Sequence, residues 1–120
     1  MSVLIVDAAN VVGARPDGWW KDRAAAAARL HAELLRADLD DDLLVLVLEG
    51  AAKQGVPAGR SPGFRVVHAP KDGDSAIVAE AKAASERGQR VRVVTADRAL
   101  AANVAPYATT LGPTWLLARL

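Results

Sequence analysis

The stretch VLIVDAANVVG, residues 3–13, is an apolar run that ends abruptly in an acid, Asp7, with Asn10 about one helical turn further on. Consecutive valine, leucine and isoleucine residues favour a buried β-strand. A carboxylate directly after such a strand lies where the following loop begins, and Asn10 is spaced to point the same way. The stretch therefore predicts a buried strand that carries polar groups at its carboxyl end.

Similar apolar runs recur along the chain and alternate with patterns typical of helices. The runs are nearly continuous rather than alternating, which indicates burial on both faces of a parallel sheet. The predicted strands span 2–6, 43–49, 64–69, 91–96 and, more weakly, 107–112. The predicted helices span 19–37, 74–88, 97–104 and 113–120, the first with a start signal at Pro16 and Asp17. The Gly- and Pro-rich stretch 53–63 predicts a loop.

Alternating strands and helices build βαβ units with right-handed crossovers. We therefore expect an α/β fold, a three-layer sandwich with a mainly parallel sheet of about five strands flanked by helices. A chain of 120 residues is the size of one domain, so a single domain over 1–120 is expected.

Composition excludes several kinds of site. Fifteen basic and fourteen acidic residues give a net charge of +1, which neither requires nor excludes a nucleic-acid partner. The chain has no cysteine, which excludes disulfides, thiolate chemistry and cysteine zinc sites, and His31 and His68 are too far apart to show ligand spacing. Neither a signal peptide nor a membrane-spanning run is present, so we expect a cytoplasmic protein with no membrane partner.

Acidic residues follow each of the four main predicted strands. They are Asp7, Glu49, the pair Asp72 and Asp74, and Asp97. Ligands of parallel sheets bind at the carboxyl ends of the strands, so these carboxylates are expected at one edge, where like charges repel unless a cation offsets them. Oxygen ligands without cysteine or paired histidine favour Mg²⁺ or Mn²⁺, which activate water for phosphodiester hydrolysis.

Helix capping is the alternative for each acid taken singly. Aspartate is a preferred N-cap and is stabilised by the helix dipole, so Asp74 and Asp97 could serve as caps alone. The convergence of the whole set on one edge, with Asp7 at the end of a buried strand, favours a site.

Three motifs, in this order, resemble those of NYN domains, a branch of the PIN-like ribonuclease superfamily. They are VDAANVVG (6–13), DGDSAIV (72–78) and VTADRAL (94–100), and the resemblance spans essentially the whole chain. The run RPDGWWKDR (15–23) is similar to a bacterial subset of such domains.

The resemblance implies a PIN-like parallel sheet whose carboxylates bind Mg²⁺ or Mn²⁺ and hydrolyse RNA. It implies catalytic roles for Asp7, Asn10, Asp74 and Asp97, and we expect metal ligation by Asp7, Asp74, Asp97 and Glu49, with Asp72 as the alternative to Glu49. Members of the family commonly double the central acid, whereas this chain has Ser75 after Asp74, which weakens the expected metal site.

Basic and aromatic residues near the predicted edge suggest RNA contacts. We assign phosphate or RNA binding to Arg15, Lys21, Arg23, Arg98 and Ser75, although a solvated basic face is the plain alternative. Trp19 and Trp20 point about 100° apart on a helix, so at least one is expected to be partly exposed. It could stack a base, close a dimer contact or cover the sheet edge.

Three functions follow from these features. The first is a metal-dependent ribonuclease, with endonucleolytic cleavage as one form, acting on RNA. The second is a phosphoryl-transfer domain with Asp7 as nucleophile and Thr95 at the phosphate, disfavoured because Ala9 stands where a phosphatase motif has a second acid. The third is a catalytically weak or inactive RNA-binding or protein-interaction module. A homodimer or a protein partner is left open.

Overall fold

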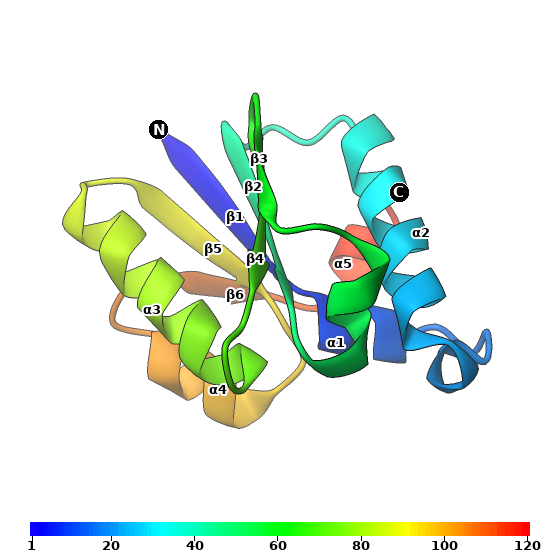
Figure 1. Cartoon of the computed structure of the whole chain (residues 1–120). Helices are drawn as coiled ribbons and strands as arrows, with labels where there is room; N and C mark the ends of the chain where they lie inside the picture. The colour runs from blue at the N-terminus through cyan, green and yellow to red at the C-terminus, as the bar shows by residue number, and fades with distance from the viewer.

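The computed structural model describes residues 1–120 and contains six strands, five α-helices and two 3-10 helices (Figure 1). In chain order they are β1 (Ser2–Asp7), α1 (Ala8–Gly13), η1 (Trp19–Lys21), α2 (Arg23–Arg36), β2 (Leu43–Leu48), η2 (Gly50–Gly55), β3 (Gly59–Ser61), β4 (Phe64–His68), α3 (Gly73–Glu86), β5 (Arg90–Val94), α4 (Arg98–Val104), β6 (Thr109–Leu111) and α5 (Pro113–Leu117).

The strands form one sheet in the order β3-β4-β2-β1-β5-β6. All neighbours are parallel except β3 and β4, which are antiparallel. This confirms the predicted mainly parallel sheet and each of its five predicted strands. The strand β1 lies inside the sheet, hydrogen-bonded to β2 on one side and β5 on the other.

Helices cover both faces of the sheet, so the fold is the expected three-layer α/β sandwich. In Figure 1, α3 and α4 lie on one side of the sheet and α1, α2 and α5 on the other. Alternate residues of β1 point to opposite faces of the sheet. Leu4 and Val6 pack in the hydrophobic cluster that includes α2, whereas Val3 and Ile5 pack in the cluster that includes α3. Burial on both faces explains why the strand is apolar without alternation.

The sheet has six strands rather than about five because the predicted loop 53–63 contains β3. A tight turn at Pro62 and Gly63 folds β3 back onto β4, and Gly63 has a φ of 71°, which glycine adopts without strain. All three β3 residues are exposed, so the strand carries no apolar signal. The same stretch contains the end of η2, and the loop prediction was wrong for both segments.

The predicted helix 19–37 is interrupted. The structure has a short 3-10 turn, η1, and then α2, whose N-cap is Asp22, with its carboxylate accepting a hydrogen bond from the Ala25 amide. The helix therefore begins later than the signal at Pro16 and Asp17 suggested. The interruption leaves Trp19 and Trp20 on a turn before the helix.

The chain path creates a switch point between β1 and β5. From β1 the chain moves to β2 and β4 on one side, then crosses to β5 and β6 on the other side. In sheets of this kind the diverging connections open a crevice at the carboxyl ends of the strands, where ligands bind. Asp7, the last residue of β1, therefore lies at this crevice.

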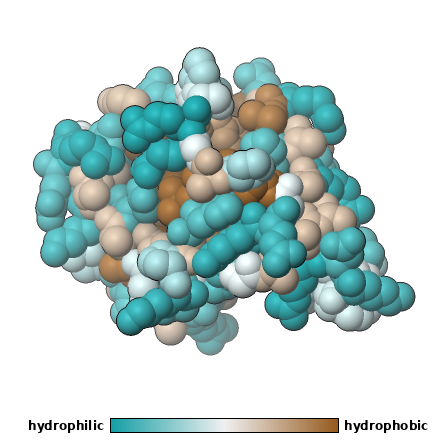
Figure 2. Space-filling model, in the orientation of Figure 1, coloured by the Kyte–Doolittle hydropathy of each residue, from teal (hydrophilic) through white to brown (hydrophobic).

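The outer surface is mostly hydrophilic on the face shown in Figure 2, where hydrophobic side chains show mainly near the middle. None of the helices combines the length and the apolar character that crossing a membrane requires.

The 3-10 helix η2 packs against the start of α2 at a point where only glycine fits. A Cβ atom on Gly55 would lie 2.0 Å from the carbonyl oxygen of Ala24 and 2.8 Å from its carbonyl carbon. Backbone atoms cannot move aside as a flexible side chain would, so the segment before β3 is held at close range to α2.

We expect Gly55→Ala to lower the free energy of unfolding by about 1–3 kcal/mol, as overpacking does in a well-packed core. The control is Gly112→Ala, because a Cβ at Gly112 meets nothing within 4 Å and its φ is −79°. Urea denaturation of the two variants measures the difference. Equal stability of both variants would contradict the close approach.

Candidate active site

Asp7 ends the inner strand β1 and is buried at 4% exposure. Its Oδ2 accepts hydrogen bonds from Asn10 Nδ2 at 2.7 Å and from Thr95 Oγ1 at 2.9 Å, and its Oδ1 accepts a longer one from the Asn10 amide at 3.4 Å. Asp7 is also the N-cap of α1. The predicted pairing of Asp7 and Asn10 is therefore present, and three donors fix the carboxylate.

Thr95, which sequence analysis placed only at the phosphate of the disfavoured phosphoryl-transfer domain, is a hydrogen-bond partner of Asp7. It directly follows β5, is 5% exposed, and its Oγ1 accepts a hydrogen bond from the Asp97 amide at 3.1 Å while its hydroxyl donates to Asp7. Val6 and Val94 are paired in register, so the next residues of the two strands meet. Knowing that β1 and β5 are neighbours would have revealed the contact, but the sequence does not give strand order.

Burial raises the pKa of the Asp7 carboxyl above its ordinary 3.8, because a charge is poorly solvated there. The hydrogen bonds from Thr95 and Asn10 oppose the shift, and the nearby negative charge of Glu49 adds to it. The hydrogen bonds therefore hold the carboxylate in place, although burial disfavours its charged form.

Glu49 follows β2 and reaches the start of α3. Its Oε2 accepts a hydrogen bond from the Gly73 amide at 2.7 Å, and a Cβ on Gly73 would lie only 3.1 Å from the Glu49 carboxyl carbon. Glycine at this position therefore lets the carboxylate approach the helix N-terminus, where the dipole stabilises negative charge. Asp72, beside it, is the N-cap of α3 and accepts from both the amide and the hydroxyl of Ser75.

The structure brings the predicted acids to one edge. Partial desolvation raises the pKa of Asp74, and the negative charges of Asp97, Asp7, Glu49 and Asp72 raise it further, in that order. An acid feels its neighbours in this way only when they lie nearby, because solvent and salt screen distant charges.

Capping accounts for part of the acidic set. Asp97 is the N-cap of α4, with its Oδ1 accepting from the Leu100 amide at 3.1 Å, which agrees with the capping alternative. Asp74 is not a cap, because Asp72 takes that position and Asp74 lies in the first turn of α3. No hydrogen bond within the protein engages the Asp74 carboxylate.

The donor set suits a hard cation, since every group is an oxygen ligand. As the side chains lie, however, no three acidic or histidine side chains are arranged to hold a metal ion. Several oxygens are already engaged: Asp7 Oδ2 with Asn10 and Thr95, and Glu49 Oε2 with Gly73. The residues therefore fit such an ion because their ligand atoms are oxygens and because they lie at the same edge of the sheet. Three of these side chains do not converge on one point as they lie.

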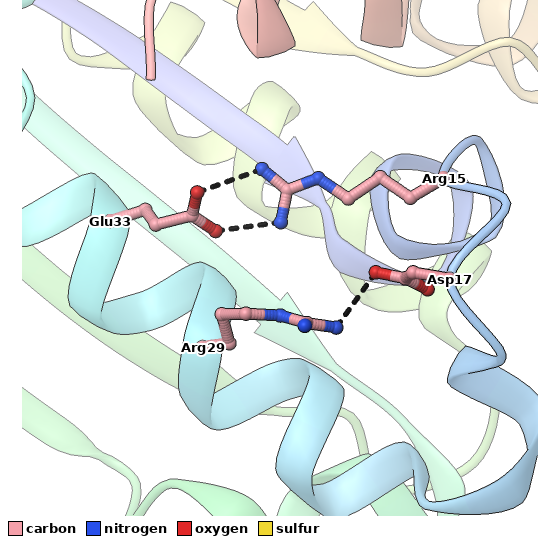
Figure 3. A network of polar contacts seen from close by, with 4 residues as sticks. All are labelled: Arg15, Asp17, Arg29 and Glu33. Atoms are coloured by element: carbon pink, nitrogen blue, oxygen red, sulfur yellow. Dashed lines mark hydrogen bonds and ion pairs between the residues drawn. The ribbon is translucent and has the colours of Figure 1, made fainter.

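The predicted RNA contacts divide into free and engaged groups. Lys21, Arg23 and Arg98 are exposed and form no ion pair. Arg15 instead forms a two-pronged ion pair with Glu33 of α2 at 2.6 and 3.0 Å (Figure 3). Ser75 donates its hydroxyl to Asp72.

A second ion pair supports the same segment. Arg29 of α2 contacts Asp17 at 2.7 Å, so the segment between α1 and η1 is tied to α2 at two points (Figure 3). These pairs hold the turn that carries Trp19 and Trp20.

The fold has a counterpart among solved structures, whereas the sequence has none among the families and curated proteins compared. No family model matches the chain, and no curated protein matches it. Its structure is similar to the crystal structure of Rae1 (YacP) from Bacillus subtilis, with a TM-score of 0.69 and 17% sequence identity, over 98% of this chain and 74% of that chain. This likeness supports the three-layer α/β fold.

We expect Asp7→Asn to raise the free energy of unfolding at pH 7. The folded-state pKa of Asp7 lies above 3.8, so ionisation destabilises the fold above that pKa and has no effect below pH 3.8, where the carboxyl is protonated in both states. The one acceptor oxygen of asparagine keeps the two short hydrogen bonds from Asn10 Nδ2 and Thr95 and loses only the 3.4 Å bond from the Asn10 amide, a smaller loss than the buried charge that it removes. Thermal unfolding of both proteins from pH 7 to pH 3 measures the difference in stability between them, which we expect to shrink as the pH falls. A variant less stable than the wild type at pH 7 would contradict a destabilising charge on Asp7.

We expect Arg15 and Glu33 to stabilise the fold by about 1 kcal/mol of coupling energy, since the pair is two-pronged and half-buried. Arg15 lowers the pKa of Glu33 below 4.5, so this contribution is present above pH 4.5 and is lost as pH falls through the lowered pKa. A double-mutant cycle with Arg15→Gln and Glu33→Gln measures it. Zero coupling at pH 7 would contradict the ion pair.

Proposed function

We propose that this protein is a metal-dependent ribonuclease that hydrolyses RNA phosphodiester bonds with Mg²⁺ or Mn²⁺ held by carboxylates at the carboxyl edge of the sheet. The observation that carries the proposal is the placement of Asp7, Glu49, Asp74 and Asp97 after parallel strands at one edge of the sheet, with Asp7 buried and held by Asn10 and Thr95. The PIN-like fold and the three NYN-like motifs support the same function.

Mutual repulsion among these acids gives a reason for a cation. Asp7 and Asp97 each keep one oxygen outside the short hydrogen bonds, and Asp74 keeps both. Asp7, Asp74 and Asp97 would hold the ion, with Glu49 as the additional ligand. A bound Mg²⁺ or Mn²⁺ supplies an activated water and offsets charge on the phosphate.

The chain's own residues orient this chemistry. The side chains of Asn10 and Thr95 donate to the Oδ2 atom of Asp7. These contacts fix the orientation of the carboxylate and so the direction of its Oδ1 atom. Partners of this kind typically change metal affinity or activity by about 10–100-fold when removed from metal sites. Thr95 also binds the Asp97 amide, so one hydroxyl links two of the proposed ligands.

The free cations provide the attraction for RNA. Arg98 directly follows Asp97 at the start of α4, and Lys21 and Arg23 flank the start of α2. Phosphate contacts by such side chains position a nucleic acid without reading its sequence. For Arg15 and Ser75, binding RNA would require exchange of their present partners Glu33 and Asp72.

A non-catalytic RNA-binding module is the second candidate. It is favoured by the lack of three converging metal ligands and by Ser75, which stands where the resemblance implies a second central acid. Under this alternative the acidic edge serves for capping, and RNA binds without cleavage.

We expect calorimetric titration with Mn²⁺ to show binding to the wild type that Asp7→Asn abolishes, because the variant removes a charged ligand. RNA cleavage falls in parallel by about 100-fold or more, the scale of one catalytic group. Asp38→Asn is the control, since Asp38 is exposed and lies before β2, at the opposite edge of the sheet.

The two candidates give different results. Metal binding and cleavage that both depend on Asp7 support the ribonuclease. RNA binding with no Mn²⁺ or Mg²⁺ binding and no cleavage supports the non-catalytic module. Cleavage that persists undiminished in Asp7→Asn would rule out the proposed site.

A further inference from the structure

A cavity of about 340 Å³ opens beside the acidic edge. It lies between α1, the start of α2, η2 and the loop that leads into α3. Small side chains, among them Ala8, Ala27 and Ala52, form its apolar part, and Trp19 is its one aromatic side chain. Its volume falls at the lower end of the range of about 300–1,000 Å³ for small-molecule pockets, so it suits one compact planar group.

The cavity shares residues with the candidate active site. Ala8 directly follows Asp7, and Glu49 and Asp72 belong both to the acidic edge and to the cavity wall. The Oε1 atom of Glu49 has no hydrogen-bond partner within the protein, so it can accept a hydrogen bond from a group in the cavity. A group bound here would lie next to the carboxylates that we propose act on RNA.

The indole of Trp19 is held in position by its surroundings. It lies at the end of α1, where a Cβ on Gly13 would be 3.8 Å from its Cζ2 atom. Trp20 meets it edge-on, with ring centres 5.9 Å apart, but Trp20 is 57% exposed and does not line the cavity. The two adjacent tryptophans therefore have different surroundings, and only Trp19 presents a ring to the cavity.

Two cations accompany this ring. The guanidinium carbon of Arg23 lies 5.1 Å from the centre of the Trp19 ring, and Lys71 lines the cavity from the loop before α3. Both side chains are exposed and form no ion pair. An aromatic ring with nearby cations is the combination that binds single-stranded nucleic acids, by base stacking and by attraction to phosphate.

We infer that this cavity takes one unpaired nucleobase of a single-stranded RNA, stacked on Trp19, with the adjoining phosphate at Arg23 and Lys71. The inference rests on the proposed ribonuclease function and deepens it by locating the site where a base of the RNA binds. The base anchors the strand so that a neighbouring phosphodiester lies at the acidic edge.

The test measures binding without cleavage. Fluorescence anisotropy with labelled single-stranded RNA octanucleotides of mixed sequence, in excess EDTA, compares the wild type with Trp19→Ala, Trp19→Phe and Trp20→Ala. Trp19→Ala weakens binding by about 5- to 150-fold, the range for loss of one stacked base. Trp19→Phe keeps most of the affinity because it keeps a ring, and Trp20→Ala leaves it unchanged.

A second probe identifies the part of the RNA that binds. Octanucleotides without bases retain the phosphates, so they bind the wild type and Trp19→Ala equally weakly. Equal losses in Trp19→Ala and Trp20→Ala, full affinity of the baseless strand, or no RNA binding at all would overturn the inference. Thermal unfolding confirms that each variant is folded.

A separate cleavage assay with Mn²⁺ keeps the two proposals apart. Binding that depends on Trp19 in a protein that never cleaves RNA overturns the ribonuclease and leaves the base site standing. Cleavage that depends on Asp7, with binding indifferent to Trp19, overturns the base site alone.

Discussion

The carboxylate of Asp7 lies at the end of a strand that is buried on both faces, and the edge around it is arranged to keep that charge in place. Thr95, directly after β5, and Asn10 of α1 both donate to it, so these contacts link the ends of two neighbouring strands and the first helix. Burial still raises the pKa of the carboxyl. A group held at such a cost contributes little to stability, and sites of this kind are frequently functional.

The N-termini of helices stabilise the carboxylates at the acidic edge. Asp7, Asp72 and Asp97 each accept an amide of the helix they precede, and Glu49 accepts the Gly73 amide. Each carboxylate is thus stabilised locally by unpaired amides and the helix dipole, although the set repels itself. Capping and metal binding are therefore compatible for Asp97 and Glu49, since each has one oxygen without a hydrogen bond in the protein.

Much of this arrangement could be predicted from the sequence. Apolar runs locate the five main strands, and the acids after them fall at one edge because parallel strands end together. The strand β3 could not be predicted, since its exposed residues Gly59–Ser61 pair only through the backbone. The contact of Thr95 with Asp7 and the partner of Arg15 were missed for a related reason: both contacts depend on which elements are neighbours in space, which local patterns do not encode.

The strand order has a consequence for how the molecule is made. The strand β1 pairs with β5, whose residues follow some 88 positions later. Contacts of such sequence separation form late, because a long loop must close first. A nascent or truncated chain that lacks β5 has Asp7 without Thr95 and without Asp97. The complete acidic edge therefore forms only once β5 has joined the sheet, because a chain cut before β5 keeps Asp7, Glu49 and Asp74 but lacks both Asp97 and the hydroxyl that orients Asp7.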